Sequence, residues 1–216
     1  CMTILHHPSE ETLAAFVNAS LGEGNSLVVA THLAHCSECR RAVREMSELG
    51  GELLEQSDTA GMSDDAREAC FARLDDTPVE AQESSNSADL HPADRPMAPA
   101  ALYQGGKWQR VGPGVYRRFI EVPDDTGTRV FMLKAAPGTR LPDHRHVGTE
   151  WTCVLKGAFI HDHGRFGAGD FDEADSSVDH NPFVEEGEEC ICLVSLNGHV
   201  EMTGWLGRLI QPLVRL

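Results

Sequence analysis

The residues with the most evident chemistry form a short cluster, HLAHCSEC, at positions 32–39. It places His32, Cys36 and Cys39 at positions i, i+4 and i+7, which share one face of a continuous α-helix. One imidazole and two thiolates that converge on a point supply three ligands of a tetrahedral zinc site. The fourth ligand is expected from His7 or His6, upstream. Because four protein ligands leave no open position, we predict a structural zinc site rather than a catalytic one.

A second cluster lies far downstream, where residues 138–157 follow the spacing Gly-x5-His-x-His-x3-Glu-x6-Gly. His144 and His146 are two residues apart, so on a β-strand they project to the same side. Glu150 is expected to reach the same metal ion from the start of the next strand, after a turn through Gly148. Imidazoles and a carboxylate suit Zn²⁺, Fe²⁺, Mn²⁺ or Ni²⁺, and the spacing does not decide between these ions.

Three histidines compete to be the fourth ligand of this second site. The segment Gly164–Asp170 resembles the beginning of a second cupin motif, and this resemblance implies a histidine ligand at the position that Asp172 occupies here. We predict that His180 reaches the metal ion instead. His161 and His163 are the alternatives, because they share a strand face and lie close by in the sequence.

Three cysteines accompany this second cluster. Cys190 and Cys192 are expected on one face of a late strand, and Cys153 on the strand that follows Glu150. The sequence leaves two interpretations open: a redox-sensitive pair near the metal pocket, or small hydrophobic side chains in a core.

Helices must position the first cluster. Ser9 is a typical helix cap followed by acidic residues, and it predicts a helix that ends near Leu21. A second helix, which would carry the cluster, is predicted from near Asn25 to a break at the glycine pair 50–51, with a bent continuation through Leu53 and Leu54 as the alternative. A third begins after Ser63.

Strands must position the second cluster. From Trp108 onward, short β-branched or aromatic segments alternate with glycines and prolines, which is typical of an antiparallel sandwich or barrel. The predicted strands are Val115–Val122, Arg129–Ala136, Trp151–Leu155, Ala158–Asp162, Glu189–Ser195 and Val200–Trp205. The chain between the two regions is polar and rich in proline. We therefore predict a helical zinc domain over residues 1–78, a linker over 79–99 and a β-domain over 100–216.

Charge and composition limit the partners. The net charge is −16, and residues 1–97 hold 18 acidic against 6 basic residues. This acidity disfavours nucleic-acid backbones and favours a basic protein partner. The sequence holds no apolar run long enough for a membrane span and no secretion signal. An odd number of cysteines with a Cys-x-x-Cys pattern predicts metal binding in a reducing cytoplasm.

The spacing from His7 to His32, followed by the Cys-x-x-Cys pair, resembles the zinc-binding anti-sigma domain, and residues 138–157 resemble the first cupin motif. In this order, the two resemble ChrR-type anti-sigma factors, which respond to photo-oxidative stress such as singlet oxygen. The resemblance implies a two-domain α + β protein: a small zinc-binding helical bundle followed by a cupin β-barrel.

The resemblance also implies a function. The helical domain would sequester an extracytoplasmic-function sigma factor from RNA polymerase, and the cupin domain would release it on oxidative stress. Each domain would hold one zinc ion, with the ligands His7, His32, Cys36 and Cys39 in the first and His144, His146, Glu150 and His180 in the second. No catalytic residue, nucleic-acid contact or membrane contact is expected. The competing interpretation is a dioxygenase-like cupin metalloenzyme, in which an open iron position activates oxygen and the helical module regulates it.

Overall fold

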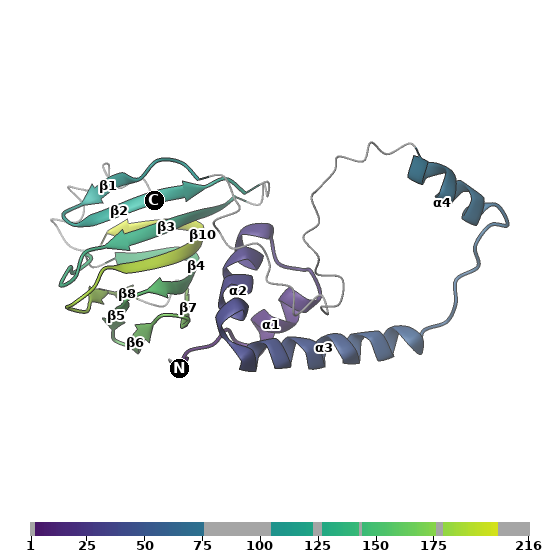
Figure 1. The fold of residues 1–216 in the computed structure, drawn as a ribbon, viewed down its shortest axis with the longest axis horizontal. Coiled ribbons are helices and arrows are strands. Elements are labelled where there is room, and N and C mark those ends of the chain that lie inside the picture. The colour runs from purple at the N-terminus through teal and green to yellow at the C-terminus, as the bar shows by residue number, and fades with distance from the viewer. Residues whose placement is uncertain (1–2, 76–104, 123–126, 143, 176–178, 203–216) are drawn as a thin grey trace.

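The computed structural model describes residues 3–75, 105–122, 127–142, 144–175 and 179–202, and Figure 1 shows how their elements are arranged. Helices occupy the N-terminal part and antiparallel strands the remainder. The predicted linker over residues 79–99 lies outside the described residues. The helices are α1 (Glu10–Val17), α2 (Glu23–His35), α3 (Ser37–Glu55) and α4 (Ala66–Asp75).

The first helix begins where the sequence predicts, because the Ser9 hydroxyl oxygen accepts a hydrogen bond from the Thr12 N–H. However, α1 ends and α2 begins earlier than predicted, so that Gly24 lies inside a helix instead of between two helices. The reason is tertiary. Gly24 faces the sheet, where a Cβ atom would lie only 2.7 Å from a methyl group of Val130.

The prediction of one helix through the whole first cluster is wrong, because the helix breaks at Cys36. This residue has extended dihedral angles (φ −104°, ψ 107°) and caps both the end of α2 and the start of α3. Its sulfur accepts the Cys39 N–H at 3.4 Å, in the role that an oxygen has at most helix N-termini. His32 therefore lies on α2 and Cys39 on α3, and the two are not on a single helix face.

The glycine pair at 50–51 does not end α3, contrary to the prediction, and the helix continues to Glu55. Among the described residues, a Cβ atom at either glycine would meet nothing within 4 Å, so both glycines border open space. A glycine lowers helix stability by about 1 kcal/mol relative to alanine, which weakens a helix without terminating it. The third predicted helix is confirmed, since α4 follows Ser63 closely.

The strands form two antiparallel sheets. They are β1 (Gln109–Gly112), β2 (Val115–Ile120), β3 (Thr128–Ala135), β4 (His144–Lys156), β5 (Ala158–His161), β6 (Gly164–Gly167), β7 (Phe171–Ala174), β8 (Asp179–His180), β9 (Phe183–Val184) and β10 (Cys190–Met202). The larger sheet has the order β1-β2-β3-β10-β4-β7, with β8 paired to β4, and the smaller has the order β6-β5-β9. The predicted antiparallel architecture is confirmed.

Two predictions about strand ends are wrong. β4 runs without a turn past Gly148, so Glu150 lies on the same strand as the two histidines before it. β10 joins two predicted strands into one that reaches Met202. The physical reason is mutual pairing: β4 and β10 pair along almost their whole length, and each supplies the other's backbone hydrogen bonds.

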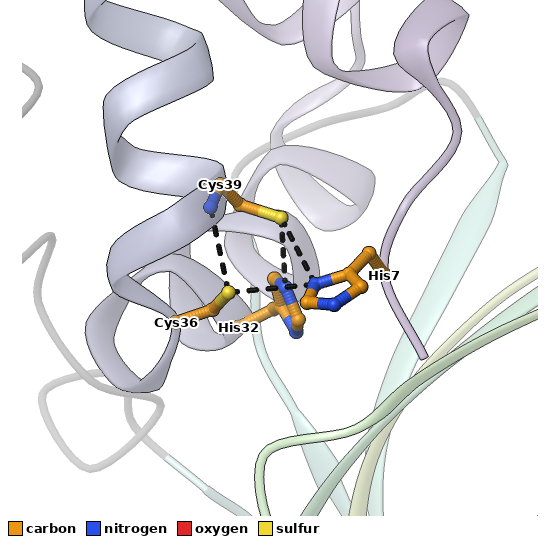
Figure 2. A group of neighbouring side chains, drawn as sticks. All are labelled: His7, His32, Cys36 and Cys39. Carbon is orange, nitrogen blue, oxygen red and sulfur yellow. Dashed lines mark hydrogen bonds between the residues drawn. The ribbon is translucent and has the colours of Figure 1, made fainter. Parts of the chain in front are cut away.

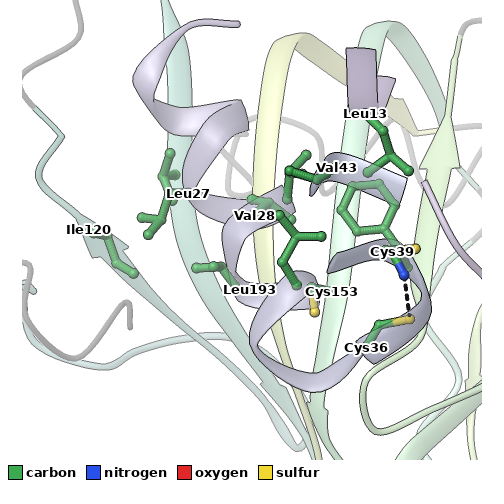
Figure 3. Close-up of a cluster of buried hydrophobic side chains, with 13 residues drawn as sticks. Leu13, Leu27, Val28, Cys36, Cys39, Val43, Ile120, Cys153 and Leu193 are labelled. Carbon is green, nitrogen blue, oxygen red and sulfur yellow. Dashed lines mark hydrogen bonds between the residues drawn. The ribbon is translucent and has the colours of Figure 1, made fainter. Parts of the chain in front are cut away.

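The helices and the larger sheet share one hydrophobic core, shown in Figure 3. Leu27 and Val28 of α2 are buried in it together with Cys153 of β4 and Leu193 of β10. A second core lies between the two sheets and includes Val154, the next residue of β4. Because neighbouring strand residues point to opposite faces, the larger sheet is covered by α2 on one face and by the smaller sheet on the other.

Candidate metal centre

Four side chains converge where the N-terminal segment meets the junction of α2 and α3: His7, His32, Cys36 and Cys39 (Figure 2). One candidate ligand atom from each lies within 4.8 Å of all the others. His7 Nδ1 is 3.4 Å from Cys36 Sγ and 3.3 Å from Cys39 Sγ, and His32 Nε2 is 3.3 Å from Cys39 Sγ. The break at Cys36 therefore does not disperse the group.

These separations fit a tetrahedral zinc ion. With Zn–S bonds of about 2.3 Å and Zn–N bonds of about 2.0–2.1 Å, a nitrogen and a sulfur at two corners of a tetrahedron lie about 3.5 Å apart. The nitrogen–sulfur distances here are 3.3–3.4 Å. Two thiolates with two imidazoles are also a donor set that suits Zn²⁺. The residues present thus fit the ion that the sequence predicts.

His32 is held in the form that a metal ion requires. Its Nδ1 lies 2.7 Å from the carbonyl oxygen of Gly169, which can only accept, so Nδ1 carries the proton and Nε2 keeps its lone pair on the side of Cys39. Burial lowers the pKa of His32 from 6.5 to about 4, so the ring is neutral at physiological pH. A neutral imidazole fixed by its other nitrogen is a typical metal ligand.

The pKa of Cys39 is shifted in the opposite direction to that of His32. Burial, together with the neighbouring Cys36, raises the pKa of its thiol to about 12. Two thiolates side by side in a buried site are unfavourable unless a positive charge lies between them. A divalent cation bound to both sulfurs would provide that charge.

The structure distinguishes His7 from His6, which the sequence left as alternative ligands. His7 faces the cluster. The ring of His6 stacks on Phe166 with centroids 4.0 Å apart, and its Nε2 lies 3.0 Å from the carbonyl oxygen of Arg165. His6 thus contacts the β-domain. His35 is exposed and stays outside the cluster.

The second predicted cluster is described mainly through its backbone, since the side chains of its three histidines lie outside the described part of the structure. The pairing of β8 with β4 places His180 directly opposite His144. His144, His146 and Glu150 occupy alternating positions of β4, which share one face of the strand. The backbone thus brings His180 next to one residue of the predicted set.

The paired strands β4 and β10 approach each other closely between Glu150 and the histidines of β4. Gly148 has φ +123° and pairs with Gly198, which has φ +104°. A Cβ atom at either glycine would collide with a carbonyl oxygen of the facing strand. Glycine is therefore needed at both positions, and Gly148 lies between the two histidines and Glu150 on the continuous strand β4.

Glu150 has a carboxyl group that favours a nearby cation. Burial, together with the nearby Asp172 carboxylate, raises its pKa to about 8. At neutral pH this group is largely protonated when no cation is present, and a bound metal ion would shift it to the carboxylate.

His161 and His163, the alternatives to His180 as the fourth ligand of the second site, each have a distinct environment. His161 Nε2 lies 3.2 Å from a carboxylate oxygen of Asp172, and His161 Nδ1 accepts the backbone N–H of His163 at 3.1 Å. Its ring also stacks on Phe166, with centroids 4.7 Å apart. Both ring nitrogens of His161 are therefore engaged, and His163 is exposed.

The cysteines of the β-domain divide between the two cores. Cys190 and Cys192 are buried between the sheets with their sulfur atoms 3.7 Å apart, whereas Cys153 faces the helices. A hydrogen bond with Cys190, together with burial, holds the pKa of Cys192 well above its ordinary range. The Cys192 thiol is therefore a poor nucleophile in the folded protein.

Sequence reasoning missed that the β-domain contributes to the helical cluster. The Gly169 carbonyl orients His32, and the Phe171 ring packs edge-to-face against it, with centroids 5.6 Å apart. The only signal in the sequence was the glycine-rich segment that ends at Asp170. That segment bore only on the fourth ligand of the second site, and it predicted no contact with the helices.

Comparisons with known proteins agree with this architecture. Residues 102–200 match the family described as the ChrR cupin-like domain. The chain is 35% identical over 221 residues to the anti-sigma-E factor ChrR of Cereibacter sphaeroides, and the match covers 100% of both chains. The crystal structure of Rhodobacter sphaeroides SigE in complex with the anti-sigma ChrR superposes with a TM-score of 0.71 and 33% identity, covering 90% of this chain and 100% of that one.

No helix in the described part of the chain combines the length and apolar character needed to cross a membrane. The relationship extends over the helical part and the cupin-like part alike, and it confirms the resemblance found in the sequence. The chain therefore belongs to the ChrR family of anti-sigma factors.

Proposed function

We propose that this protein is an anti-sigma factor that sequesters an extracytoplasmic-function sigma factor from RNA polymerase and releases it on singlet-oxygen-type oxidative stress. The observation that carries the proposal is the four-residue cluster at the α2–α3 junction, in a chain related over its full length to an anti-sigma factor. Support for the partner comes from a solved relative that is bound to SigE. Membership of this family indicates a regulator rather than an enzyme, and we place it in the cytoplasm, where sigma factors act.

Two zinc ions belong to the proposal. His7, His32, Cys36 and Cys39 hold the first, which ties the N-terminal segment to two helices and stabilises the helical domain. His144, His146, Glu150 and His180 hold the second. The domains keep their predicted extents, 1–78 and 100–216 with a linker over 79–99, and the two sheets close into a cupin barrel.

The sigma factor binds the exposed apolar side of α3. Leu49, Leu53 and Leu54 are 59%, 61% and 74% exposed, and Phe71 of α4 is 58% exposed. Fully burying one such side chain contributes about 1.5–3 kcal/mol, so a partner that covers several of them gains substantial affinity. The acidic charge of this half favours a basic partner surface.

A titration of the full-length chain against sigma factors of the source cell tests this function. Leu53→Asp should weaken binding at least tenfold, because it buries a charge in the interface. Ile160→Asp, at an exposed apolar residue of β5, is the matched control and should leave affinity within about twofold. Unchanged affinity in Leu53→Asp would contradict the assigned surface.

Substitution of the thiolates tests the first zinc ion. Cys36→Ser should remove one zinc ion per chain and weaken sigma binding in parallel, because the metal links α2, α3 and the N-terminal segment. Zinc is quantified by mass spectrometry of the purified protein. A variant that lacks zinc and still inhibits fully would show that the metal is dispensable for function.

A separate variant tests the sensing role of the cupin-like domain. Glu150→Ala should empty the second site, keep the sigma factor repressed in unstressed cells and prevent its release under singlet oxygen. The readout is the transcription of the sigma-dependent genes. Constitutive transcription would show that this site maintains inhibition, and a normal stress response would show that it is not the sensor.

A further inference from the structure

A turn of the β-domain contacts one candidate zinc ligand, His32, and the chain segment that leads into a second one, His7. This 167–171 turn connects β6 to β7. The carbonyl oxygen of Gly169 accepts the Nδ1–H of His32 at 2.7 Å, and the Phe171 ring packs against the same imidazole. The β-domain thus holds His32 in place through a hydrogen bond to Nδ1, the ring nitrogen that does not face the cysteines.

Asp170 holds the chain that leads into the second ligand, His7. Its carboxylate is buried, and Oδ1 accepts the backbone N–H groups of Leu5 at 2.7 Å and His6 at 3.0 Å. Oδ2 accepts the Gly167 N–H at 2.8 Å, within the turn. The Phe171 N–H completes the contact by donating to the His6 carbonyl at 3.1 Å. The residues just before His7 are therefore fixed to the turn by three hydrogen bonds.

The 167–171 turn also packs closely against the N-terminal segment and against α2. Gly169 has φ +91°, and a Cβ atom there would lie 2.8 Å from the Ile4 side chain and 3.4 Å from the Cβ of His35. Backbone hydrogen bonds of 2.8 and 3.0 Å join Gly169 and Asp170 to Val154 of β4. The contacts therefore run from the helical cluster to the same strand that carries Glu150.

We propose that Asp170 and the Gly169 carbonyl are positioning groups for the helical zinc site, so that the β-domain sets the metal affinity of that site. The inference rests on the proposed zinc ion at His7, His32, Cys36 and Cys39. Groups that orient metal ligands through hydrogen bonds contribute about 10- to 100-fold to metal affinity. Because such coupling is reciprocal, a change in the turn weakens the zinc site, and loss of zinc loosens the turn.

A cobalt titration of the metal-free full-length chain measures this coupling. The sulfur-to-cobalt charge-transfer band reports only a site with thiolate ligands, so Co²⁺ bound by His144, His146, Glu150 and His180 does not contribute to it. Asp170→Ala should raise the Co²⁺ dissociation constant about 10- to 100-fold, with the band at saturation unchanged because all four ligands remain. Asp170→Asn keeps one acceptor oxygen and should recover part of the affinity.

Glu173→Ala is the matched control. This carboxylate lies on β7, three residues after Asp170, and likewise accepts a backbone N–H of the N-terminal segment, that of Ser9 at 3.3 Å, but the contact is exposed. We expect its cobalt affinity to stay within about twofold of the wild type.

An unchanged dissociation constant in Asp170→Ala would overturn the inference, and so would a weaker band at saturation, which would mean that a ligand had been lost. If that variant does not fold, hydrogen exchange of the wild type decides: the amides of Leu5, His6 and Phe171 should exchange at least tenfold more slowly with Co²⁺ than without it, and equal rates would overturn the inference. A wild-type chain without any charge-transfer band would instead refute the proposed thiolate zinc site itself.

Discussion

Leu27→Ala tests whether the helices and the larger sheet unfold as one unit. Leu27 lies on α2 and is only 1% exposed, in the core that α2 shares with β4 and β10. Truncation leaves a cavity between a helix and a sheet that are each held by other contacts, so the space cannot easily collapse.

The magnitude follows from this burial. Leu→Ala substitutions in protein cores cost about 2–5 kcal/mol, and a site this enclosed should cost about 3 kcal/mol. For chains of this length, each kcal/mol lowers the Tm by about 2–4 °C, so we expect a decrease of about 6–12 °C. The zinc concentration must be held constant, because bound metal raises the Tm by mass action.

The assay compares two optical probes during thermal unfolding. The three tryptophans, at positions 108, 151 and 205, all lie in the predicted β-domain, so their fluorescence reports on that part. Far-ultraviolet circular dichroism reports mainly on the helices. Both transitions should move down together in Leu27→Ala. The matched control is Leu53→Ala on α3, where the side chain is 61% exposed and the change should stay within about 0.5 kcal/mol.

One result would refute the reasoning. If the helical signal in Leu27→Ala melts early while tryptophan fluorescence keeps its wild-type transition, α2 and the sheet are not one cooperative unit, and the shared core contributes little to the stability of the β-domain.

Two further predictions follow from local geometry. Gly50→Ala should raise the free energy of unfolding by about 1 kcal/mol, since nothing lies within 4 Å of its Cβ position. Gly24→Ala should lower it by about 1–3 kcal/mol, because the new Cβ would lie 2.7 Å from the Val130 side chain. Thermal unfolding of both variants measures these changes, and stabilisation by Gly24→Ala would contradict the packing of α2 on the sheet. In native protein, iodoacetamide should alkylate the exposed Cys70 readily and leave Cys153 unmodified even at pH 9, because burial raises the pKa of Cys153 to about 12. Peptide mass spectrometry locates the label. Rapid alkylation of Cys153 would show that the interface with α2 opens.

The sequence by itself determined the features that depend on neighbouring residues. Ser9 caps α1 because its hydroxyl needs only the N–H three residues later. His32, Cys36 and Cys39 are close in sequence and therefore close in space in either helical arrangement. The short β-branched segments likewise predicted antiparallel strands, because alternation is a local property of a half-buried strand. The motif spacings were sufficient to identify the family.

Only the tertiary structure decided how these parts meet. Helix α2 includes Gly24, which packs against the sheet, although glycine lowers helix stability by about 1 kcal/mol, and it ends at Cys36, which has extended backbone angles. The choice of His7 over His6 depends on Phe166, which holds the His6 ring. His32 meets a carbonyl 137 residues away in sequence, and Leu5 meets a carboxylate 165 residues away. No local pattern encodes such contacts, because they arise only when separate elements bury their apolar faces against one another.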